Sequence, residues 1–131
     1  MTIPVKTGEV FFKGSIVTVK AGLAYNGTNS DETHAAIGIA YQSITAAQSA
    51  GGDGEANGGT DLIVEPGTFG DFTADAAANN PTFANRLTTV YVLDDDTLST
   101  SSDTSTRCSV TLYDVADDGL TLAAQFNEVL P

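Results

Sequence analysis

The chain has 131 residues, with 17 acidic against five basic side chains and a formal net charge of −12. A chain of this length makes one domain. Its acidity excludes binding to nucleic-acid phosphates and to anionic membrane surfaces, because both would repel it. No apolar run approaches the roughly 20 residues of a membrane-spanning helix. We therefore expect a soluble acidic domain, in which the single cysteine, Cys108, forms no internal disulfide.

The predicted elements, taken in chain order, are short strands. Apolar residues alternate with period two, which is typical of half-buried strands, and no long window keeps the period of a helix. Turn residues such as Ala21-Gly22, Asn26-Gly27 and Pro66-Gly67 separate the apolar runs. We expect strands at residues 10–13, 15–20, 34–41, 60–65, 68–73, 87–93, 108–115 and 120–126. The pattern predicts an all-β fold, a small single-domain barrel or sandwich of about seven short strands.

Three polar stretches interrupt the strands. Residues 43–59 are small and polar, and we expect a flexible Gly-rich loop near 51–59. Residues 74–85 can form one or two turns of helix at their alanines, and residues 99–106 predict a polar hairpin tip. We therefore expect a single β domain over residues 1–131, with long polar loops and at most one short helix.

The beginning of the chain predicts an extended N-terminal arm over residues 1–7. Its first five residues are apolar and contain Pro4. Such an arm can add to a neighbour's sheet or lie across it. The alternatives are an ordinary first strand and a frayed terminus.

The basic residues are unevenly distributed. Lys6, Lys13 and Lys20 face only Glu9 within the first 20 residues, whereas the remaining 111 residues carry two arginines against 16 acids. This distribution favours a basic N-terminal face that docks on an acidic partner. Equally, the lysines can lie at strand edges and prevent unwanted pairing.

Catalytic candidates are few. His34 is the only histidine and Cys108 the only thiol, and Cys108 falls within a predicted strand, where a cysteine is normally buried. The sequence contains no nucleophile elbow, no phosphate-binding glycine loop and no zinc-binding spacing. We expect neither an enzyme nor a cofactor.

Two acidic clusters are the candidates for a metal site. Asp94, Asp95 and Asp96 form the denser one, and a second comprises Asp114, Asp117 and Asp118. Calcium prefers several oxygen ligands, but the spacing does not fit the EF-hand loop. We expect a solvated strand end and no metal, with Asp94, Asp95 and Asp96 as the calcium candidates.

The order of features resembles the capsid decoration, or structural cement, proteins of tailed bacteriophages. The matching stretches include HAAIGIAYQSI with its Gly-Ile-Ala segment at 38–40, and TTVYVLDDDTLST with Val-Tyr-Val at 90–92 followed by Asp96-Thr97. Others are GEVFFKGSIVTVKAG, VEPGTFGDF and RCSVTLYDVADDGLTLAAQF. The resemblance spans most of residues 8–126. The loop at 51–59 and the stretch at 74–85 depart from the family pattern.

The resemblance implies a structural protein of the virion without catalytic residues. Such proteins are made in the host cytoplasm and bind the outside of the phage head at junctions between major capsid protein subunits. They commonly associate as trimers and sometimes as dimers, and they stabilise the expanded shell.

We expect the capsid contact at the N-terminus, where the interface candidates are Met1, Thr2, Ile3, Pro4, Val5 and Lys6. Deleting residues 1–6 should then weaken capsid binding and leave the fold intact. The alternative function is a secreted or surface-displayed β-module that binds glycan or calcium.

Overall fold

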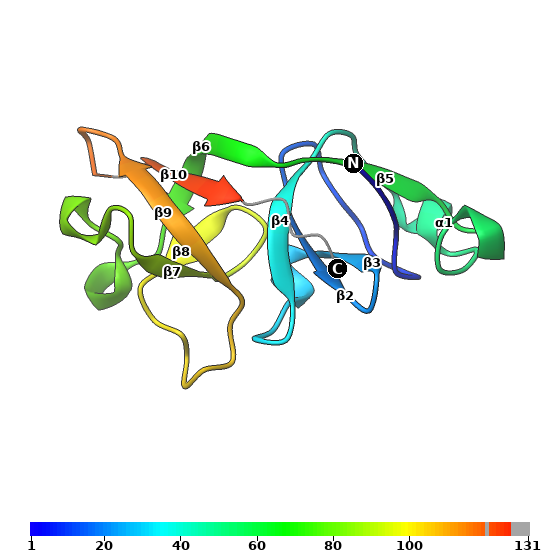
Figure 1. Ribbon diagram of the computed structural model, residues 1–131, viewed down its shortest axis with the longest axis horizontal. Helices are drawn as coiled ribbons and strands as arrows, with labels where there is room; N and C mark the ends of the chain where they lie inside the picture. Colours follow the sequence, from blue (N-terminus) through cyan, green and yellow to red (C-terminus); the bar gives the residue numbers. More distant parts are fainter. Residues whose placement is uncertain (120, 127–131) are drawn as a thin grey trace.

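Two five-stranded sheets make up most of the structure (Figure 1). The computed structural model describes residues 1–119 and 121–126. The sheet half contains β1 (Thr2–Pro4), β2 (Ile16–Lys20), β3 (Leu23–Asn26), β4 (Ala35–Ala40) and β5 (Asp61–Glu65). The barrel half contains β6 (Gly67–Ala74), β7 (Thr89–Val92), β8 (Thr97–Ser99), β9 (Ser109–Val115) and β10 (Thr121–Phe126). The prediction of a small, single-domain, all-β fold is confirmed.

The sheet half is antiparallel, in the order β1-β5-β4-β2-β3. It curls until its two edges meet, where Val5 forms an isolated parallel bridge with Ala24 of β3. There the Lys6 N–H donates to the Ala24 carbonyl at 3.1 Å. The sheet is therefore closed on itself by a single bridge.

The prediction of an extended N-terminal arm over residues 1–7 is wrong, because this segment does not extend freely from the domain. Residues 2–4 form β1, which pairs antiparallel with β5 of the same chain. Ile3 and Val5 are buried in the core, whereas Thr2 is exposed. Alternation of apolar and polar side chains places Ile3 and Val5 on the inner face of this strand.

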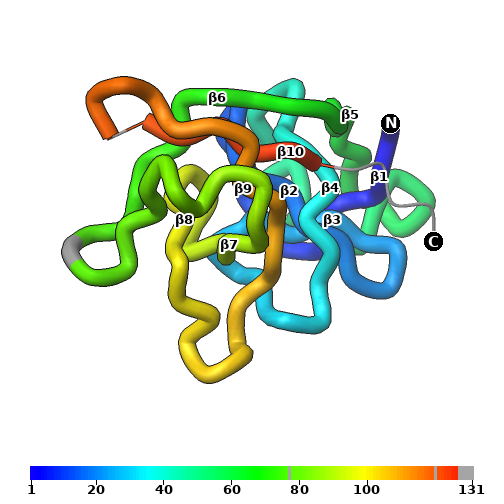
Figure 2. Tube along the Cα trace, turned by 60° about the vertical axis from the view of Figure 1, so that its left-hand side comes forward, coloured from blue at the N-terminus to red at the C-terminus, as the bar shows by residue number. Residues whose placement is uncertain are grey.

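The barrel half is closed by a complete ladder in the order β10-β6-β8-β7-β9. All its pairs are antiparallel except β6 with β8. Strand β6 follows β5 directly after Pro66, so one continuous path carries the chain from the sheet half into the barrel half (Figures 1 and 2).

The described residues form ten strands, three more than the seven or so expected. The unexpected ones, β1, β3 and β8, have only three or four residues each. Conversely, residues 10–13 form no strand, and only Phe11 makes an isolated bridge, with Ile44. Very short strands carry too few alternating side chains to be recognised from sequence.

Two turn predictions have different outcomes. Ala21 and Gly22 have φ angles of 53° and 79° and connect β2 to β3, so the turn predicted at these residues is present. Residues 99–106 are not a hairpin tip, because β8 and β9 both pair with β7 and not with each other. They form a long connection that projects from the barrel half, yellow to orange in Figure 2.

Helical structure is limited to short pieces. The one α-helix of the described residues, α1 (Ala46–Ser49), begins at a capping box made by Thr45 and Gln48. Four 3-10 turns are present in the same residues, and two of them confirm the helical turns predicted in 74–85. They are η1 (Gly27–Asn29), η2 (Glu55–Asn57), η3 (Ala77–Asn79) and η4 (Phe83–Asn85).

Strands β2 and β4 serve the cores of both halves. In β2, Ile16 belongs to the core of the barrel half and the next residue, Val17, to that of the sheet half. In β4, Ile39 packs against the barrel core and Ile37 lies in the sheet core. In β2 neighbouring side chains point to opposite faces. In β4 the register shift between the pairs Val17–Gly38 and Thr18–Ala36 lets Ile37 and Ile39 face opposite sides although they are two residues apart, so the two strands form a shared wall between the halves.

Candidate functional site

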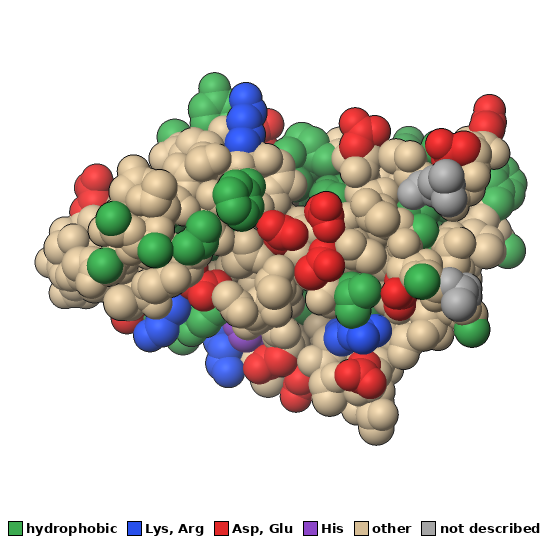
Figure 3. Space-filling model, turned by 180° about the vertical axis from the view of Figure 1, so that it is seen from behind, with side chains coloured by type: hydrophobic (Ala, Val, Ile, Leu, Met, Phe, Trp, Pro, Cys, Tyr) green, Lys and Arg blue, Asp and Glu red, His purple; other side chains and the backbone are tan. Residues whose placement is uncertain are grey.

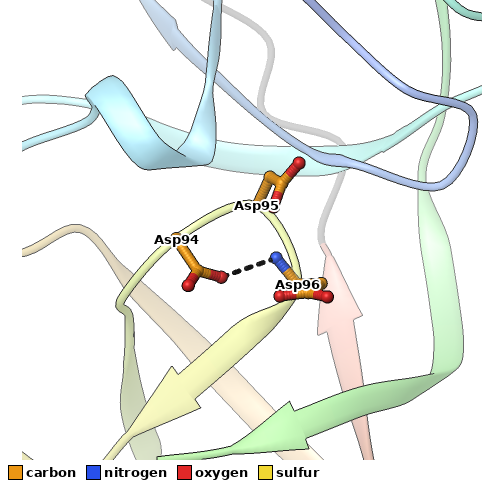
Figure 4. Close-up of side chains that lie close together, drawn as sticks. All are labelled: Asp94, Asp95 and Asp96. Atoms are coloured by element: carbon orange, nitrogen blue, oxygen red, sulfur yellow. Dashed lines mark hydrogen bonds between the residues drawn. The ribbon is translucent and has the colours of Figure 1, made fainter.

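The first acidic cluster lies on the β7–β8 connection, which packs against the sheet half (Figure 4). One carboxylate oxygen from each of Asp94, Asp95 and Asp96 lies within 4.8 Å of the others. All three carboxylates already accept protein donors. Asp94 Oδ1 accepts the Asp96 N–H at 3.0 Å, Asp95 Oδ2 accepts the Ser15 hydroxyl at 3.2 Å, and Asp96 Oδ1 accepts the Thr97 hydroxyl at 3.0 Å.

The ionisation of Asp94 and Asp96 differs. Burial opposes charge on Asp94, but hydrogen bonds from Asp96 and Thr97 lower its pKa below the ordinary value. The pKa of Asp96 is raised, first by its hydrogen bond to the Asp94 side chain and then by burial. The cluster is therefore organised by its own hydrogen bonds, and Asp95 is tied to the sheet half.

The acidic surface extends between the halves. Asp71, Asp95 and Asp96 line a hollow of about 380 Å³ together with residues 12–15. Figure 3 views the molecule from behind and shows acidic side chains gathered near the middle of that face. The second predicted cluster, Asp114, Asp117 and Asp118, is not part of this surface and lies at the far end of the barrel half.

His34 is held by polar neighbours and not by a nucleophile. Its side chain is 4% exposed, and Nδ1 lies 3.0 Å from Asp31 Oδ1. The Tyr25 ring meets the imidazole edge-on at 4.7 Å. Hydrogen bonds from the Thr33 hydroxyl, the Thr33 N–H and His34, in that order, hold the pKa of Asp31 well below its usual range.

Cys108 contacts the main chain of His34 and not its imidazole. Sγ donates to the His34 carbonyl oxygen at 3.4 Å. The side chain is fully buried, and burial raises the pKa of the thiol to about 11. A thiol that stays protonated and faces a carbonyl oxygen is a structural contact between the two halves, not an activated nucleophile.

The predicted interface residues are divided between core and surface. Ile3 and Val5 are buried, so neither projects from the surface toward a capsid. Met1 and Thr2 remain exposed. Lys6 Nζ lies 3.5 Å from Asp53 Oδ2, and Asp53 also accepts the Thr7 N–H and hydroxyl. These contacts tie the Gly-rich loop to the first strand.

Exposed apolar side chains gather at two places that the sequence did not reveal. The sheet patch consists of Phe12, Lys13, Tyr41 and Ile63. Phe12 is 66% exposed and Tyr41 52%, and Lys13 Nζ lies 5.9 Å from the Tyr41 ring. The Tyr41 N–H donates to the Ile63 carbonyl, which places the two residues side by side.

The barrel tip consists of Phe83, Arg86, Leu87, Tyr113 and Asp114. Phe83 is 61% exposed and Leu87 71%. The Arg86 guanidinium lies 3.6 Å from the centre of the Phe83 ring and 3.9 Å from Asp114. The one sequence signal for this site is the presence of large apolar residues within the polar run PTFANRL.

A groove opens in the sheet half between β1 and the β2–β3 hairpin. This sheet groove has a volume of about 630 Å³, and Ile3, Val19 and Ile37 supply apolar walls. His34 also lines it, and the buried Nε2 of this residue has no hydrogen-bond partner among the described residues. The exposed Lys20 lies at the rim. Apolar hollows with few polar groups are typical of binding sites.

Comparisons with protein-family models, with curated proteins and with solved structures found no match. Within the described part of the chain, no helix has the length and apolarity needed to cross a bilayer.

Proposed function

We propose that this chain is a capsid decoration protein that binds the outside of a tailed-phage head and stabilises the expanded shell. The sequence resemblance supports it, and the sheet patch is the observation that carries it. Its partner would be the major capsid protein at junctions between subunits. The chain would be made in the host cytoplasm and reside on the outer surface of the virion.

The sheet patch has the composition of a docking surface. Aromatic side chains bury large areas at small entropic cost and are enriched where interfaces are tightest. Tyr41 and Ile63 are exposed side by side, and Lys13, which follows the exposed Phe12 in the chain, lies over the Tyr41 ring. Phe12 and Lys13 also line the acidic hollow, so the patch would offer a partner apolar rings with charges of both signs at its border.

Multiple contacts would make such binding effective. A single patch of this size falls short of the roughly 800 Å² per partner of a stable interface. An oligomer that engages several capsid subunits at once gains avidity of about 10² to 10⁴, because later contacts form at high effective concentration. A shell braced in this way fails only when several contacts open together.

The proposal is tested by mixing the purified protein with expanded empty shells and measuring occupancy by electron microscopy. The double variant Phe12→Ala, Tyr41→Ala should weaken binding at least about tenfold. Phe83→Ala is the matched control, since it removes an equally exposed ring at the other end of the molecule. At dilute protein it should leave affinity for a single capsid site unchanged. Absence of the wild-type protein from expanded shells would reject the proposal.

A further inference from the structure

Two surfaces on opposite halves of the molecule are complementary in form. The barrel tip is formed by the β6–β7 connection and β9, at the end of the molecule far from β1–β5 (Figures 1 and 2). The sheet groove lies in the other half, between β1 and the β2–β3 hairpin. Because hydrogen-bonded strands fix both halves, the tip and the groove of one copy cannot meet each other.

The barrel tip is held rigidly in its exposed position. Leu87 has φ of 62°, a conformation that is unusual for a bulky residue, and its N–H donates to the Leu112 carbonyl at 2.7 Å. Thr82 and Asn85 form a capping box that fixes the turn carrying Phe83. Arg86 stacks on the Phe83 ring. A surface ordered before binding loses little entropy when it docks.

The charges around the two surfaces are opposite. Asp114 and Asp117 are exposed beside Phe83, and only Arg86 balances them. The groove carries the exposed Lys20 at its rim. An apolar projection with an acidic border therefore faces an apolar hollow with one lysine, Lys20, at its rim, and their union would bring Asp117 and Lys20 together.

We propose that the barrel tip of one copy of this chain docks in the sheet groove of a second copy. Phe83 and Leu87 enter the groove between β1 and the β2–β3 hairpin, and Asp117 approaches Lys20. The contact joins different surfaces of the two copies, so it repeats from copy to copy and produces a closed ring or an open chain. Phe83, Leu87 and Tyr113 together bury less area than a stable interface requires, so the association depends on protein concentration.

The test is sedimentation of the full chain over a range of concentrations, without capsids. The mean mass of the wild type should rise with concentration. Phe83→Ala removes the projection and Thr2→Trp fills the groove from an exposed position of β1, so each alone should stay monomeric. Their equal mixture should form dimers and nothing larger, since each variant retains one working surface. Phe12→Ala, equally exposed but outside both surfaces, should associate like the wild type.

A charge exchange gives a second, independent reading in case Thr2→Trp does not fold. Lys20→Glu should weaken association at least several-fold, and mixing it with Asp117→Lys should restore pairing between the two variants. A wild type that is monomeric at every concentration would overturn the proposal. So would undiminished association of Phe83→Ala, or a mixture of the two single-surface variants that stays monomeric. None of these results depends on whether the protein binds capsids.

Discussion

The two halves of the molecule contain the same number of strands but are closed in different ways. The barrel half is closed by a complete strand ladder. In the sheet half, the edges of β1 and β3 meet at a seam, where the one backbone bridge described is between Val5 and Ala24. Side chains complete the closure of this seam. The comparison shows that the sheet half depends on its N-terminal residues, whereas the barrel half can close without them.

Glu9 supplies much of the connection across the seam of the sheet half. Its side chain is buried, Oε1 accepts the Asn26 N–H at 2.7 Å, and Oε2 accepts the Asn29 side-chain amide at 2.9 Å. The Ser49 hydroxyl donates to the Glu9 carbonyl at 2.8 Å. A buried carboxylate thus replaces the strand pairing that the barrel half uses for the same purpose.

Among the changes considered, deletion of residues 1–6 should lower the stability of the sheet half the most. It removes Ile3 and Val5 from the sheet core and leaves β5 with β4 as its one remaining partner, so the free energy of unfolding should fall by about 4 kcal/mol or more. Denaturant unfolding measures the loss, with Thr2→Ala as the exposed control on the same strand. Full retention of stability would show that the sheet half closes without β1. The predicted loss differs from the earlier expectation that the deletion leaves the fold intact, because residues 2–5 pair with β5 and pack in the core.

Glu9→Ala should cause the next largest loss of stability. It leaves the buried Asn26 N–H without its acceptor and removes the hydrogen bond from the Asn29 side chain, and should cost about 1–3 kcal/mol. Glu55→Ala removes an exposed glutamate of the same half and should change stability by less than about 0.5 kcal/mol. Equal effects of the two substitutions would mean that Glu9 does not hold the seam.

Alkaline pH should loosen the contact between the halves. The pKa of the Cys108 thiol is raised from 9.0 to about 11, so above pH 9 the unfolded chain releases this proton more readily than the folded one. Stability from this group is complete below pH 9 and falls by about 2–3 kcal/mol as the pH rises to 11. Unfolding of the wild type and of Cys108→Ala, compared at each pH, isolates this loss. Identical pH profiles would contradict the burial of the thiol.

Calcium should have the smallest effect on stability. It tests whether the acidic cluster of the β7–β8 connection, in the barrel half, binds a cation. Asp94 and Asp95 already accept protein hydrogen bonds, so millimolar calcium should change the unfolding temperature by less than about 1 °C. Thermal scans with calcium and with a chelator measure this. A rise of several degrees that Asp96→Asn abolishes would establish a cation site and favour the alternative β-module function.

The sequence predicted the fold class because its longer strands alternate clearly, as in β5, β9 and β10. In β4 a small residue lets a neighbouring backbone come close. A Cβ at Gly38 would lie 2.2 Å from the Glu65 carbonyl oxygen. The N-terminal strand was open to two interpretations because five apolar residues suit both an inserted strand and an arm.

The surfaces could not be predicted, because they depend on which residues the fold leaves uncovered. Phe11 and Phe12 are adjacent in sequence, yet Phe11 is in the core and Phe12 is exposed. Phe83, Leu87 and Tyr113 come together only after β9 packs beside the β6–β7 connection. The local alternation of apolar and polar residues predicts the strands. Pairing between distant segments decides which side chains stay exposed and can face a partner.

Occupancy of the protein on phage shells tests the central claim most directly. Expanded and unexpanded empty shells would be incubated with the wild type and imaged by electron microscopy. We predict ordered density for the protein on the outside of expanded shells at subunit junctions, with its sheet patch against the capsid. Bare expanded shells at saturating protein, or density that is unchanged by the double variant Phe12→Ala, Tyr41→Ala, would contradict it.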